Sequence, residues 1–173
     1  MMFLYSCGSA QEEAVVTGLK TIDSKEFSIS LPEKWNVIED YSSLPTPPKW
    51  EITLLANASD LKYGFSNNIV ILSQDLWKFV SSKDFSILNN VGASREYLEY
   101  TRLESNDMNF SDGDITQAYV FEAKYNVQTP ILKFVQFWKV CGTTRWHLIT
   151  IAVSQDTKVM DPYLEFAKTF TCK

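Results

Sequence analysis

The sequence has little of the chemistry that most enzymes need. It contains a single histidine, His147, which lies in an apolar run, and no Gly-x-Ser-x-Gly motif that would present a nucleophilic serine. Its 6 glycines are scattered and form neither a dinucleotide-binding fingerprint nor a phosphate-binding loop. We therefore expect no enzyme and no cofactor, and we interpret His147 as a structural residue.

Positive charge and long hydrophobic runs are also scarce. There are 16 basic against 21 acidic side chains, a net charge of -5, so the chain lacks the basic surface that binds nucleic acid. No apolar run approaches the roughly 18 residues that span a bilayer. With 173 residues, 45% of them apolar, the chain can form one folded domain. We therefore expect no nucleic-acid partner. We also expect that any attachment to a membrane is through an anchor.

A metal site is not expected either. The stretch from Asp107 to Asp114 resembles a calcium-binding loop, but its glycine is Gly113, one position too late. Position 118 is alanine, where the glutamate ligand is required. We interpret the stretch as an acidic turn.

The N-terminal residues resemble the end of an export signal. Leu4, Tyr5, Ser6 and Cys7 are similar to the lipobox of bacterial lipoproteins, in which the cysteine becomes the acylated first residue. The six residues before Cys7 are too few for a whole signal peptide, so we expect them to be its remnant. We accordingly divide the chain into a signal remnant (1–7), a flexible tether (8–24) and one domain (25–173). The resemblance implies a bacterial cell-envelope protein, lipid-anchored through Cys7 and facing the periplasm or the exterior.

If Cys7 carries lipid, two cysteines remain. Cys141 lies in a turn between two predicted strands, and Cys172 follows the last predicted helix, which should return toward that turn. An even remainder in an exported chain indicates a disulfide, whereas two buried free thiols are the other interpretation.

The apolar periodicity predicts an α+β domain. Alternation over 27–31 indicates a first strand, and the runs 51–56 and 68–73 indicate a hairpin. Three longer strands, 115–126, 131–140 and 145–153, have short connections and form an antiparallel meander. Helical spacing predicts helices over 84–104 and from Asp161 to Phe170, with Tyr163, Phe166, Ala167 and Phe170 as the buried stripe of the second. Because both faces of the meander are apolar, we expect a central antiparallel sheet with helices on both faces, an α/β/α sandwich.

One predicted loop has the composition of a contact surface. It combines Pro45, Pro47 and Pro48 with the aromatic residues Tyr41 and Trp50. A rigid extended backbone loses little entropy on binding, which favours a partner-contact loop. The other interpretation is that Trp50 fills the core.

The chain resembles the PsbP-like superfamily, named after an extrinsic photosystem II subunit. The resemblance rests on Phe27-x-Ile29-x-Leu31-Pro32-x-x-Trp35, on the helix before a strand meander, and on the closing helix with Phe166 and Phe170. It implies a sheet with helices on both faces, and a role in protein binding or assembly. Our first hypothesis is a non-catalytic envelope lipoprotein that binds or helps to assemble another envelope protein. The alternative is a periplasmic carrier of a small apolar ligand.

Overall fold

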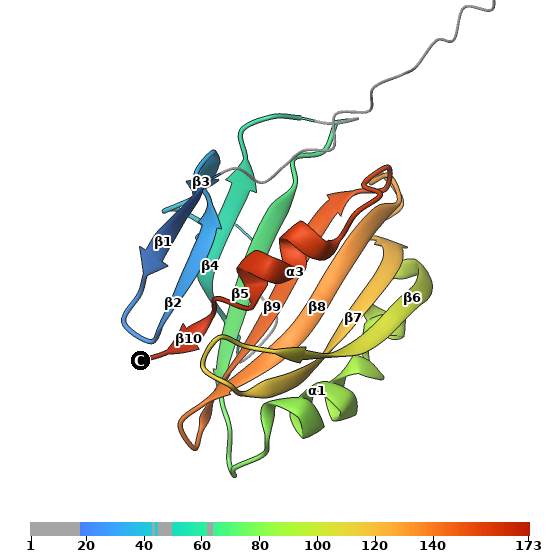
Figure 1. Ribbon diagram of the computed structural model, residues 1–173. Coiled ribbons are helices and arrows are strands. Elements are labelled where there is room, and N and C mark those ends of the chain that lie inside the picture. Colours follow the sequence, from blue (N-terminus) through green and yellow to red (C-terminus); the bar gives the residue numbers. More distant parts are fainter. Residues whose placement is uncertain (1–17, 43, 45–49, 62–63) are drawn as a thin grey trace, which may run out of the picture.

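The computed structural model describes residues 18–42, 44, 50–61 and 64–173 of the chain (Figure 1). About half of these residues lie in the strands of two antiparallel sheets, and the helices are few and short. The larger sheet has seven strands in the order β3-β4-β5-β9-β8-β7-β6. Its strands are β3 (Trp35–Val37), β4 (Glu51–Ala58), β5 (Asn68–Asp75), β6 (Leu98–Asn109), β7 (Ile115–Lys124), β8 (Leu132–Cys141) and β9 (Arg145–Ser154).

The smaller sheet joins the two ends of the described chain. Its strands are β1 (Leu19–Asp23), β2 (Phe27–Pro32) and β10 (Thr171–Cys172), in the order β1-β2-β10. Every residue of β1 pairs with β2, so the ordered domain includes residues that the sequence assigned to a tether over 8–24. The strand was missed because Leu19 and Ile22 are the only large apolar residues among its five.

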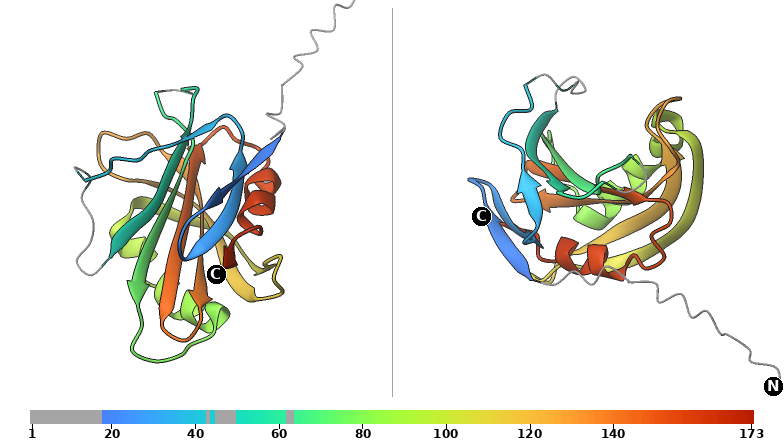
Figure 2. Two further views of the ribbon diagram at one scale, coloured as in Figure 1. Left: turned by 90° about the vertical axis from the view of Figure 1, so that its left-hand side faces the viewer. Right: turned by 90° about the horizontal axis from the view of Figure 1, so that it is seen from above.

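Apolar side chains cover both faces of the central strands, as the alternation predicted. Val135 of β8 belongs to one core cluster, together with Phe166 of α3 (Asp161–Ala167). Its neighbour Phe134 belongs to a second cluster, together with Phe85 of α1 (Ser82–Asn90). In Figure 1, α3 lies across the front of the sheet, and the view from above shows that the sheet is strongly curved (Figure 2).

The helices are shorter than the sandwich prediction required. Helix α1 has 9 residues and α3 has 7, so at about 1.5 Å per residue neither spans a seven-stranded sheet. Part of the face under α3 is covered by β2, whose Phe27 and Ile29 join the same cluster. The coarser prediction, an antiparallel sheet with helices packed on it, describes the fold.

The predicted helix over 84–104 is wrong in its second half. Helix α1 ends at Asn90, a single turn α2 (Ala93–Glu96) follows, and the chain then forms β6. Leu98, one of the residues with helical spacing, lies in β6 and remains 44% exposed, so that spacing did not reflect burial. Two irregularities in the pairing of β6 with β7 break the two-residue alternation that would have identified a strand.

Candidate protein-interaction surface

Helix α1 turns its polar side chains toward the sheet. Ser82, Ser86 and Asn90 recur every fourth residue and are only 2%, 0% and 7% exposed. Phe85 is buried on the same side, where its ring packs on Trp146 of β9 with ring centroids 4.4 Å apart. A surface helix normally directs its apolar stripe to the core. In α1 the side that faces the sheet is mainly polar, so the helix is rotated the opposite way about its axis.

Hydrogen bonds to distant segments hold α1 in this orientation. The Ser82 hydroxyl donates to Asp114 Oδ2 at 2.6 Å and accepts from the Val140 amide at 2.9 Å. The Ser86 hydroxyl donates to the carbonyl of Gln117 at 2.5 Å. Buried polar groups need such partners, and here the partners fix the rotation of α1 about its own axis.

The same rotation places apolar side chains in solvent. Ile87, Leu88 and Val91 lie on the outer side of the helix and are 45%, 69% and 70% exposed. Trp77 and Phe79, in the connection between β5 and α1, are 97% and 63% exposed. We call these five side chains the α1 surface. Single exposed apolar residues are ordinary, but a group of them on one short segment is typical of an interaction site.

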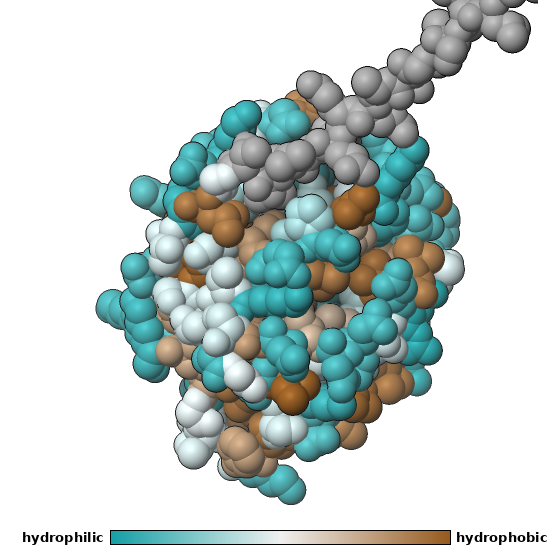
Figure 3. All heavy atoms as spheres, in the orientation of Figure 1, coloured by the Kyte–Doolittle hydropathy of each residue, from teal (hydrophilic) through white to brown (hydrophobic). Residues whose placement is uncertain are grey.

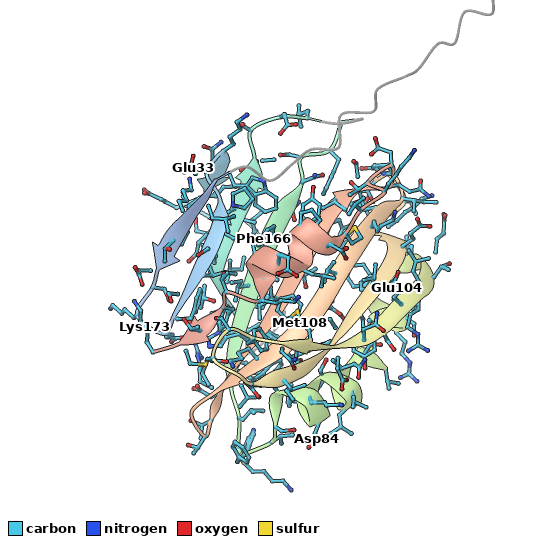
Figure 4. The ribbon with its side chains drawn as sticks, in the orientation of Figure 1. Glu33, Asp84, Glu104, Met108, Phe166 and Lys173 are labelled. Carbon is cyan, nitrogen blue, oxygen red and sulfur yellow. A yellow bond between two sulfur atoms is a disulfide. The ribbon has the colours of Figure 1, made fainter. Side chains whose placement is uncertain are left out.

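Among the described residues, those on the face that carries α3 form a different pattern. In the space-filling view of that face, apolar residues lie scattered among hydrophilic ones (Figure 3). The side-chain view places Phe166 on α3 over the sheet and Asp84 on α1 at the lower edge of the molecule (Figure 4).

The contact loop predicted from the sequence is described only at its ends. Pro45, Pro47 and Pro48 lie outside the described residues. Trp50 is partly buried against the second core cluster, with its ring centroid 4.1 Å from that of Trp146. Tyr41 is partly exposed. The packing of Trp50 fits the interpretation in which it fills the core beside α1.

Cys141 and Cys172 form a disulfide, with their Cα atoms 5.5 Å apart. The bond joins the end of β8 to β10 and so connects the large sheet to the small one. This settles the choice between a disulfide and two free thiols. Cys7, the predicted lipidation site, lies outside the described residues.

His147 is buried and cannot act as a surface base. It is 0% exposed, and its Nδ1 lies 2.7 Å from the Ser73 hydroxyl. Its ring also packs edge-on against Phe27. Burial, aided by the nearby Arg145 guanidinium, lowers the pKa of His147 to about 3, so the imidazole is neutral at neutral pH.

The acidic turn forms an ion cluster with a lysine of the sheet. Lys139 of β8 is 2% exposed, and its Nζ lies 2.9 Å from Asp112 Oδ2 and 2.9 Å from Asp114 Oδ2. The same ammonium stands 4.4 Å from the centroid of the Phe110 ring. Because Asp114 also accepts from Ser82, this cluster connects the β6–β7 turn, the sheet and α1.

A small cavity lies at the opposite end of β8 and β9. Its volume is about 260 Å³, and Phe65, Pro130, Ile131 and Leu132 supply its apolar lining, with Ser154, Gln155 and Asp156 at its polar side. Within the described part of the chain, no group of side chains has the composition of a metal site. The same residues include no helix with the length and apolarity needed to cross a membrane.

Comparisons with known proteins give likenesses in structure only. No family model and no curated protein matches the sequence. Among solved structures, the Ran-binding protein Mog1p of Saccharomyces cerevisiae matches with 10% identity and a TM-score of 0.48, over 89% of this chain and 95% of that one. A protein from Bacteroides thetaiotaomicron matches with 11% identity and a TM-score of 0.39, over 85% of this chain and 45% of that one. Both TM-scores lie below 0.5, so these likenesses do not assign a family or a function.

The sequence carried a signal for the α1 surface that periodicity alone did not resolve. Polar Ser82, Ser86 and Asn90 form one stripe of the helix, and apolar Leu88 and Val91 lie on the other side. Either stripe could face the sheet. The choice depends on two acceptors, Asp114 in the β6–β7 turn and Gln117 in β7, and on the amide of Val140 in β8, which only the folded chain brings to the helix.

Proposed function

We propose that this chain is a non-catalytic, protein-binding domain of a cell-envelope lipoprotein, and that it binds its partner through the α1 surface. The single observation that carries the proposal is the reversed helix, whose apolar side faces solvent while its serines are buried. Burial of apolar area supplies most of the free energy of protein association. Trp77 and Phe79 together offer on the order of 300 Å² to a partner, because one aromatic side chain buries roughly 150–250 Å².

Two further parts of the proposal rest on the sequence. Cys7 anchors the chain to a membrane of the bacterial envelope, and the domain has the PsbP-like arrangement in which α1 and α3 are reduced helical layers on the two faces of the sheet. The first described strand, β1, begins at the end of the molecule away from α1 (Figure 1). An anchor attached before β1 therefore leaves the α1 surface free to meet a partner.

Exchanging Cys7 for serine should release the protein from membranes. A thioether-linked diacylglycerol anchors stably because each buried CH₂ contributes about 0.8 kcal/mol, and serine cannot carry it. Fractionation of cells expressing the Cys7→Ser chain should find it in the soluble fraction, with the wild type in the membrane pellet. Equal membrane retention of both proteins would contradict the anchor.

A paired substitution tests the binding function. Leu88→Asp with Val91→Asp should reduce recovery of the envelope partner on the immobilised protein at least about tenfold, because two charges would be desolvated on binding. Leu103→Asp is the matched control, since Leu103 is a 46% exposed leucine of β6 and is not one of the five side chains of the α1 surface. Thermal unfolding of each variant establishes that it folds. Unchanged recovery with the Leu88 and Val91 pair would refute the proposed surface.

The alternative is a carrier of a small apolar ligand, and the cavity of about 260 Å³ favours it. A cavity this size is small beside the roughly 300–1,000 Å³ of ordinary ligand pockets, which is why we rank it second. Native mass spectrometry of protein purified from its own host separates the two functions. A carrier arrives with a ligand mass, whereas a docking domain arrives without one.

A further inference from the structure

The outer side of α1 has opposite charges at its two ends. Asp84 is exposed in the first turn, on the same side of the helix as Leu88 and Val91. Arg95 is exposed in α2, which follows without a reversal because Val91 and Gly92 keep right-handed helical backbone angles. Within the described residues, Arg95 has no carboxylate at ion-pair distance. The apolar stripe is therefore bounded by an acid at its start and by an unpaired cation at its end.

This pattern is self-complementary. If two such helices cross antiparallel with a two-fold axis between positions 88 and 91, each Leu88 meets a Val91 of the other copy. The same register brings each Asp84 to an Arg95, so two opposite-charge contacts form at once. An isologous interface requires this kind of patch, in which position i meets j and j meets i.

We infer that the occupant of the α1 surface is a second copy of this chain, paired antiparallel through α1 with Asp84 of each copy against Arg95 of the other. The inference rests on the proposed function, because both use the same surface. Gly92 then faces Ile87 of the other copy, and a residue without a side chain permits the close approach of two helices.

The exposed area suits a dimer of moderate affinity. A specific interface should bury about 1,000 Å² in total, or about 500 Å² from each copy. Trp77 and Phe79 offer on the order of 300 Å² of this from each copy. Ile87, Leu88 and Val91, which are 45%, 69% and 70% exposed, contribute the remaining apolar area.

Charge exchange tests the register directly. The full chain with Cys7→Ser, which carries no lipid, is examined by sedimentation equilibrium as wild type, Asp84→Arg, Arg95→Asp and the double exchange. The parent chain should dimerise, and each single exchange should raise its dissociation constant at least about tenfold, because like charges then meet twice. An equimolar mixture of the two single variants should recover dimerisation, since both contacts in the mixed dimer pair opposite charges. The double exchange should recover it as well.

The mixture guards against loss of folding, because an unfolded variant cannot be rescued by another. A parent chain that stays monomeric throughout, or a dimer that ignores both single exchanges, would overturn the inference. A monomeric parent that still recovers an envelope partner dependent on Leu88 and Val91 would refute only the second copy as occupant. If the substitutions at Leu88 and Val91 reduce neither dimerisation nor recovery of an envelope partner, the proposed function itself is refuted.

Discussion

Replacing Asp112 and Asp114 together by asparagine should lower the free energy of unfolding by about 3–5 kcal/mol, the usual cost of stranding a buried charge. Lys139 is 2% exposed and has both carboxylates as its ion-pair partners. Without them, the ammonium must stay buried without a counter-charge or lose its proton. Urea unfolding followed by tryptophan fluorescence measures the loss.

Lys139→Met is the matched control for that experiment. Methionine fills similar space without charge, and the side chains of Asp112 and Asp114 are 33% and 37% exposed, so water can solvate them. We expect a loss of only about 1 kcal/mol. If the two asparagines cost no more than the methionine, the cluster does not compensate a buried charge.

Asp114 adds a pH dependence to the cluster. Burial by itself raises the pKa of this carboxyl, but hydrogen bonds from Ser82 and Lys139 and the lysine charge outweigh it and hold the pKa below the ordinary 3.8. The folded pKa therefore lies below the unfolded one. The stabilisation from Asp114 is present above the unfolded pKa and is lost as the pH falls through the folded pKa.

Exchanging both Cys141 and Cys172 for serine should cost about 3–4 kcal/mol, the chain-entropy value for a closed loop of this size. The two cysteines are 31 residues apart, and the bond ties β10 of the small sheet to the end of β8 in the large sheet. Wild-type protein unfolded in the presence of a reductant should match the double-serine variant. Cys7→Ser should leave the unfolding free energy unchanged. Equal stability of the oxidised wild type and the double-serine variant would contradict a stabilising disulfide.

The sequence predicted those elements whose residues alternate or repeat within one segment. The meander of β7, β8 and β9 followed from alternation such as Phe134 against Val135, and α3 followed from Asp161 and Pro162. In β6, pairing irregularities and a strand with exposed residues on both faces removed that alternation, so a helix was predicted over its first part. Strands as short as β3 and β10 leave too few residues for any period.

The candidate site was less accessible to sequence reasoning than the fold. For the proline-rich loop the sequence offered two interpretations, a partner contact or a Trp50 that fills the core, and in the structure Trp50 packs on Trp146. The α1 surface depends on which side of a helix faces the sheet, and Ser86 decides this through a bond to Gln117, 31 residues away. Hydrogen bonds between such distant segments leave no periodic trace in the sequence.

Photo-crosslinking from within α1 tests the central claim most directly. A photoreactive amino acid placed at position 88 of the chain in living cells should form a covalent adduct with protein, identifiable by mass spectrometry. The same amino acid at position 103, where Leu103 is also about half exposed on β6, should not. The absence of adducts at position 88 would contradict a protein-binding α1 surface. Adducts there that are no more abundant than those at position 103 would contradict it as well.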